Sequence, residues 1–124
     1  MPHCVVEYSA NLASEGDVPG LLEKIASRYR AAGDLFPAVG IRIRAIEVAD
    51  YVIADGARDR SFVHLTCKIM PGRPEEPMAD FFRDMFELVK AHFAPLFETR
   101  EIGLSLDVET SAAGKGHKHH NIRL

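Results

Sequence analysis

The sequence is poor in the features that mark secreted, membrane-spanning and nucleic-acid-binding proteins. It has two cysteines among 124 residues, and its formal net charge is −3. No apolar run approaches the roughly 20 residues that a membrane-spanning helix needs. The N-terminus also lacks the basic segment followed by an apolar one that marks a signal peptide. These absences predict a cytoplasmic protein with no general affinity for nucleic acid or membranes.

Both cysteines, Cys4 and Cys67, lie in apolar segments typical of strands. Buried free thiols are the expected state in a reducing compartment, while the spacing alone leaves a disulfide open. The chain is 47% hydrophobic and 27% charged. This composition and length suit one globular domain with a real core, so we expect a single domain over residues 1–124.

Apolar periodicity predicts two helices and four strands. In chain order we expect a strand that ends at about Tyr8, a helix over Val18–Ala32, strands over Val39–Val48 and Arg60–Met70, a helix that begins at Pro74 and kinks or ends at Pro95, and a strand over Ile102–Val108. Asp17 is the expected N-cap of the first helix and Gly33 its C-cap. A shift of the apolar phase at Ala45-Ile46 suggests a β-bulge.

The order strand–helix–strand therefore occurs twice. The halves cover about residues 2–56 and 57–110, with a break near Asp55-Gly56, and a polar tail follows over 111–124. Each half should place its two strands in parallel with a right-handed crossover. We thus predict an α+β fold in which tandem β-α-β units form a four-stranded mixed sheet with two helices on one face. The other face retains apolar residues, so we expect another subunit to cover it.

Pro2 is the first candidate functional residue. Proline has no backbone N–H and is tolerated at the first residue of a strand. If Met1 is removed, Pro2 carries a free secondary amine, and α-amino groups have a pKa of about 7.7–8.0. Desolvation or nearby positive charge would lower this pKa further, and a rigid strand could hold the amine as a general base. The simpler interpretation is that Pro2 only protects the terminus.

Three arginines could supply that positive charge. Arg42 and Arg44 share one face of the second strand, and Arg73 lies in a turn between Gly72 and Pro74. Guanidinium groups pair carboxylates bidentately and keep their charge. Grouped beside an amine, they would bind an acidic substrate and lower the pKa of the amine. The alternative is ordinary surface charge at strand edges and turns.

Together these features resemble a known family over nearly the whole chain. The matching segments are Pro2-His3, Val6-Glu7, Leu12, Pro19-Gly20-Leu21, Phe36-Pro37, Gly40-Ile41-Arg42, Arg44, Ala54-Asp55-Gly56, Phe62-Val63-His64, Lys68-Ile69, Gly72-Arg73, Phe86-Glu87-Leu88, His92-Phe93 and Leu104-Ser105. With them the sequence is similar to the 5-carboxymethyl-2-hydroxymuconate isomerases of the tautomerase superfamily.

This resemblance implies a trimer with active sites at subunit boundaries and no metal or organic cofactor. Pro2 would be the general base that moves a proton along a conjugated 2-hydroxymuconate-type acid, in the catabolism of homoprotocatechuate. Arg42 and Arg73 match positions that hold the substrate carboxylates, and Arg44 matches with a less defined role. A tautomerase of another acidic substrate and a non-catalytic trimeric binding module remain the alternatives. The expected partners are therefore a small acidic substrate and two further copies of the chain.

The remaining histidines give weaker signals. His117, His119 and His120 lie in a Gly/Lys-rich tail without Cys or carboxylate partners at ligand spacing, so we expect no metal site there. We expect His64 to be a hydrogen-bonded strand residue. His3 neighbours Pro2, but strand alternation turns it to the opposite face.

Overall fold

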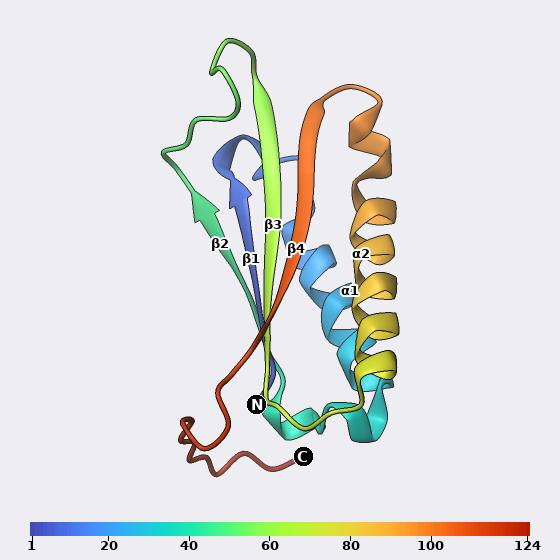
Figure 1. Cartoon of the computed structure of the whole chain (residues 1–124). Helices are drawn as coiled ribbons and strands as arrows, with labels where there is room; N and C mark the ends of the chain where they lie inside the picture. Colours follow the sequence, from blue (N-terminus) through green and yellow to red (C-terminus); the bar gives the residue numbers. More distant parts are fainter.

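Two helices pack against one face of a four-stranded mixed sheet (Figure 1). The computed structural model describes residues 1–124. Its elements are β1 (His3–Ser9), α1 (Val18–Ala31), β2 (Arg42–Val48), β3 (Arg60–Ile69), α2 (Glu75–Phe97) and β4 (Glu101–Thr110). The strands lie in the order β2-β1-β3-β4. Both β1–β2 and β3–β4 are parallel, and β1–β3 is antiparallel, so the predicted fold is confirmed.

Strand alternation builds the core between sheet and helices. On β3, Val63, Leu65 and Cys67 are buried, and residues between them turn to the other face. The apolar side of α2 meets them with Met78, Phe81, Phe82, Met85, Val89 and Phe93. Asp17 caps α1 as predicted, because its carboxylate accepts a hydrogen bond from the Gly20 N–H at 3.2 Å.

Three sequence predictions about the element boundaries are wrong. The second strand begins at Arg42 rather than Val39, since Ala38–Gly40 forms a 3₁₀ turn. No bulge interrupts it: the pairing with β1 runs without a break, and Ile46 is simply exposed on the outer face. Pro74 is the N-cap of α2 with an extended backbone, not its first helical residue.

Pro95 does not end α2, because the helix continues for two further residues to Phe97. A proline lacks the N–H that would bond four residues back. Two residues further on, the helix is closed by bonds from Glu98 N–H to Pro95 O and from Arg100 N–H to Leu96 O. Neither α1 nor α2 combines the length and the apolar character that a membrane-spanning helix needs.

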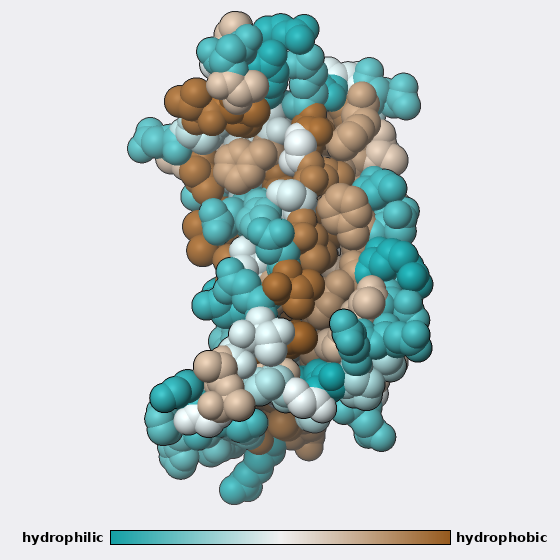
Figure 2. Space-filling view, viewed as in Figure 1, coloured by the Kyte–Doolittle hydropathy of each residue, from teal (hydrophilic) through white to brown (hydrophobic).

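The sheet face turned away from the helices is mainly polar, and it retains the apolar residues Val5, Ile46 and Phe62. It carries His3, Val5 and Glu7 of β1, Arg44 and Ile46 of β2, Phe62, His64, Thr66 and Lys68 of β3, and Ser105 and Asp107 of β4. His64 is hydrogen-bonded as expected, with Nδ1 2.6 Å from Ser105 Oγ. Further apolar residues form a band along the seam between β4 and α2 (Figure 2). In this region Val108 and Phe97 are 42% and 51% exposed.

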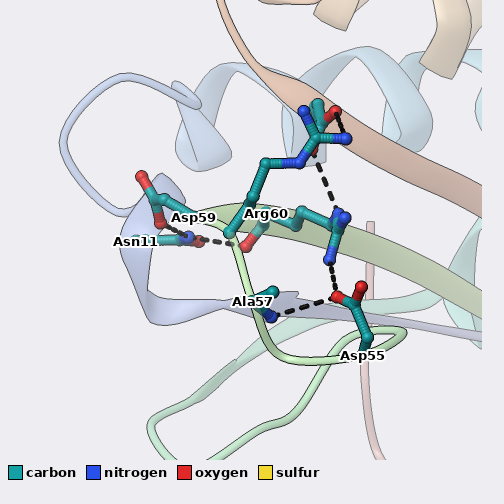
Figure 3. Close-up of polar contacts among 7 residues, drawn as sticks. Asn11, Asp55, Ala57, Asp59 and Arg60 are labelled. Carbon is teal, nitrogen blue, oxygen red and sulfur yellow. Dashed lines mark hydrogen bonds and ion pairs between the residues drawn. The ribbon is translucent and has the colours of Figure 1, made fainter.

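A polar network fixes the position of the loop before β3, at the end of the sheet far from the N-terminus (Figure 3). The Arg60 guanidinium donates to Asp55 Oδ1 at 2.7 Å and to Glu101 Oε2 at 3.1 Å. Asn11 donates to Asp59 and to the Arg60 carbonyl. Hydrogen bonds from the Ala57 N–H and from Arg60 lower the pKa of Asp55. This network is a structural device, since none of its residues lies near the N-terminus.

Cys4 and Cys67 are free and buried, which confirms the prediction of buried thiols. They face each other across β1 and β3, with the two Sγ atoms 3.7 Å apart. The contact with Cys67 and burial raise the pKa of the Cys4 thiol well above its usual value. Cys4 therefore stays a neutral thiol, and both cysteines pack as small side chains of the core.

The Tyr29 hydroxyl is buried near the Cys67 thiol, with which it makes at most a weak contact, and it has no nitrogen or oxygen partner. Its ring packs against Phe36 and Phe81, with centroids 4.9 and 5.0 Å away. An unpartnered buried hydroxyl costs about 1–3 kcal/mol. We therefore expect Tyr29→Phe to raise the free energy of unfolding by about 1 kcal/mol in urea titration. A variant less stable than the wild type would show that the hydroxyl has a partner.

Candidate active site

Pro2 is held rigidly where the chain enters β1. The residue is buried, and its carbonyl accepts a hydrogen bond from the Arg42 N–H at 3.0 Å. Gly40 lies against it: a Cβ built there would be 3.4 Å from Pro2 Cδ and 3.3 Å from Met1 Cα. Any larger residue at position 40 would crowd the N-terminus. The backbone of the 3₁₀ turn before β2 thus forms one wall around Pro2.

The amino group at this end of the chain lies among positive charges. In the structure it belongs to Met1. Its pKa is lowered first by burial, then by the charges of Lys118, Arg73 and Arg42. An amine is charged when protonated, so burial and cations both favour the neutral, basic form. The surroundings therefore shift the terminal amine toward the neutral form, which can accept a proton.

Arg42 is anchored by main-chain carbonyls next to Pro2. Its Nη1 donates to Val39 O at 3.0 Å and to Ile41 O at 2.9 Å. These bonds fix one end of the guanidinium and leave other N–H groups for a ligand. Such pre-organisation reduces the entropy lost when a carboxylate binds.

Main-chain carbonyls hold Arg73 in the same way. Its Nε donates to Leu35 O at 2.8 Å and its Nη1 to Met70 O at 3.0 Å. The guanidinium carbon also lies 5.1 Å from the centre of the Phe36 ring. Arg73 is therefore held by several contacts and is not an ordinary surface charge. Arg73 links the loop before α2 to the loop after α1 and is also a structural residue.

Arg44 lies two residues beyond Arg42 on the outer face of β2 and contacts His3. Its Nη1 is 3.0 Å from His3 Nδ1. Burial, and then the charge of Arg44, lower the pKa of His3, so the imidazole is neutral near pH 7. The structure thus groups Arg42 and Arg73 around the N-terminus and places Arg44 next to His3.

A pocket of about 270 Å³ opens at the N-terminus. It is lined by Met1, His3, Lys68, Met70, Ser111, Gly116, His117 and Lys118. A second, more apolar pocket of about 320 Å³ adjoins it through Met70 and reaches Arg73 and Phe82. The lysines of the first pocket were missed from the sequence. Lys118 in particular lies in a tail without periodicity, and only its positive charge could have singled it out.

The chain has the tautomerase fold. A fused 4-OT protein described as a symmetric trimer superposes with a TM-score of 0.57 at 15% identity, over 93% of this chain and 94% of that one.

Closer relatives define the family. Residues 2–124 match the family described as 5-carboxymethyl-2-hydroxymuconate isomerase. The 5-carboxymethyl-2-hydroxymuconate Delta-isomerase of Escherichia coli is 40% identical over 98% of this chain and 96% of its own length. The crystal structure of a 5-carboxymethyl-2-hydroxymuconate isomerase from Deinococcus radiodurans R1 has a TM-score of 0.92 at 35% identity, over 97% of this chain and 90% of that one. The chain belongs to the 5-carboxymethyl-2-hydroxymuconate isomerase family, and it is an isomerase.

Proposed function

We propose that the protein isomerises 5-carboxymethyl-2-hydroxymuconate, with the amine of Pro2 as general base after removal of Met1. The observation that carries this proposal is the burial of Pro2 at the chain end where the charges of Arg42 and Arg73 act on the terminal amine. The names of the E. coli and D. radiodurans relatives support the substrate. We place the reaction in the cytoplasm, in the catabolism of homoprotocatechuate, as the family resemblance implies.

The electrostatics of the site support the base. The Met1 amine already has a lowered pKa next to Lys118, Arg73 and Arg42. Pro2 is buried while Met1 is attached, and the burial that remains after processing favours the neutral form of its amine. The proline ring restricts its motion and keeps the lone pair in one direction. General bases act best with a pKa near the working pH.

The proposed reaction moves one proton from an oxygen to a carbon of the same substrate molecule. Pro2 takes the proton of the 2-hydroxyl group, which leaves a dienolate with negative charge spread along the conjugated carbons. The prolinium then returns the proton to a carbon further along the chain, and the hydroxyl oxygen becomes a ketone. Arg42 and Arg73 bind two carboxylates and stabilise the developing charge in a site with little water. Arg44 supports the anionic ligand from the outer face through its contact with His3.

A panel of substrates tests this proposal. We expect the processed protein to convert 5-carboxymethyl-2-hydroxymuconate with a higher kcat/KM than dienols that carry one carboxylate, because Arg42 and Arg73 are both placed to bind one. The reaction is followed by the ultraviolet absorbance of the dienol. Faster turnover of a monocarboxylate would favour a tautomerase of another acidic substrate.

We further propose a homotrimer. Both edge strands, β2 and β4, are unpaired on their outer sides, and the seam of β4 exposes apolar side chains. The 4-OT relative of the same fold is described as a trimer. In sedimentation velocity at micromolar concentration we expect one species of three times the chain mass of 13.7 kDa. A lone monomer boundary would contradict this assembly.

A further inference from the structure

The polar tail after β4 returns to the N-terminal end of the sheet. Its first residue extends the sheet, because Ser111 N–H donates to Ile69 O at 2.9 Å. A turn follows at Gly114, whose φ of +72° suits glycine. Gly116 then lies against Met70, since a Cβ built on it would be 3.7 Å from Met70 Cε. Figure 1 shows both chain ends at this end of the fold.

The tail thereby forms one wall of the pocket of about 270 Å³ at the N-terminus. His117 and Lys118 come from the tail, and Lys68 and His3 come from β3 and β1. None of the eight lining residues is acidic. Glu109 at the end of β4 reaches Lys68 only loosely, with Glu109 Oε2 3.8 Å from Lys68 Nζ. The positive charge of the lining residues therefore favours binding of an anion in this pocket.

Lys118 acts on the same point as the arginines of the site. Among the charges that lower the pKa of the terminal amine, Lys118 has the largest effect, ahead of Arg73 and Arg42. Its ammonium therefore lies within electrostatic reach of the Met1 amine, one residue from the proposed base. A lysine side chain is a flexible point charge, which suits a carboxylate that moves with the substrate.

We propose that Lys118, together with Lys68, forms a binding subsite for a third substrate carboxylate. This inference rests on the proposed function for the identity of that group. A 5-carboxymethyl-2-hydroxymuconate carries two carboxylates at the ends of its six-carbon chain and a third on the carboxymethyl branch. Arg42 and Arg73 each hold one, which leaves one without a partner. The tail then selects tricarboxylates over smaller acids of the same reactivity.

Binding of unreactive acids tests the subsite without turnover. We would titrate the processed protein with tricarballylate, which has three carboxylates, and with glutarate, which has two, and follow affinity by NMR chemical shifts. An exposed ion pair contributes up to about 1 kcal/mol, so we expect Lys118→Ala to weaken tricarballylate binding about fivefold. Glutarate affinity should stay unchanged. Lys118→Arg should restore most of the loss, and the difference should shrink in high salt.

Lys115→Ala is the matched control. Lys115 lies in the same tail but does not line the pocket, so this variant should bind both acids like the wild type. Failure of the wild type to bind tricarballylate, an equal loss for both acids in Lys118→Ala, or the same loss in Lys115→Ala would overturn the subsite. The proposed function fails by a different result, namely absence of isomerisation by a processed protein that still binds tricarballylate selectively.

Discussion

Retention of Met1 will lower the rate of isomerisation by about 10²–10⁴-fold, the usual contribution of a general base. The added residue converts the Pro2 amine into an amide without useful basicity, while the core residues are untouched. Protein purified with Met1 intact can be divided and one half treated with a methionine aminopeptidase. Mass spectrometry confirms both forms, and their kcat values are then compared at the same pH.

A control variant separates loss of the base from obstruction of the pocket. Met1 itself lines the pocket, so its retention also occupies space. Processed Pro2→Ala keeps a free terminal amine without the ring, and we expect it to lose less activity than the Met1-retaining form. Both forms should keep their melting temperature and assembly. Equal rates before and after processing would remove Pro2 from the mechanism.

Arg73→Ala will lower kcat/KM by about 10- to 100-fold. A hydrogen bond to a charged group contributes about 1.5–3 kcal/mol, and we expect one such bond to a substrate carboxylate. The variant also loses the bonds to Leu35 O and Met70 O, and the free energy of unfolding should fall by about 1–3 kcal/mol. Steady-state kinetics and urea titration measure the two effects.

Arg83→Ala provides the comparison for Arg73→Ala. Arg83 is exposed on α2 and pairs only with Asp80 and Asp84. Its loss should change neither kcat/KM nor stability by more than a few tenths of a kcal/mol. If Arg73→Ala loses stability but keeps normal kcat/KM at a temperature where it is folded, Arg73 is a structural residue only.

Patterns with a strong period predicted the fold well. The alternation on β3 and the apolar side of α2 defined which faces meet, and the repeated strand–helix–strand order defined the parallel pairs. The predictions failed where tertiary contacts determined the local structure. A 3₁₀ turn packs against Met1 and Pro2, so β2 begins only at Arg42. The apolar Ile46 lies exposed on the outer face in regular strand geometry, without a bulge.

The site was predictable only in part because its side chains come from distant segments. The amine of Pro2 and the charges of the arginines could be recognised as functional groups from the sequence. The bonds of Arg73 to the Leu35 and Met70 carbonyls could not, because they depend on how two distant loops pack together. Strand alternation explains why Arg42 and Arg44 share a face, but it does not show that only Arg42 adjoins the amine. Lys118 reaches the site through a tail without regular structure, and no periodicity predicts such a path.

The most direct test of the account is the pKa of Pro2 itself. Processed protein labelled with ¹⁵N-proline allows the Pro2 nitrogen to be titrated by NMR without any substrate. Burial and the charges of Arg42, Arg73 and Lys118 should bring this pKa below the ordinary α-amino range of about 7.7–8.0. Activity should then rise with pH through the same value and level off. A Pro2 pKa within or above that range would contradict the claim that the fold prepares this amine as the base.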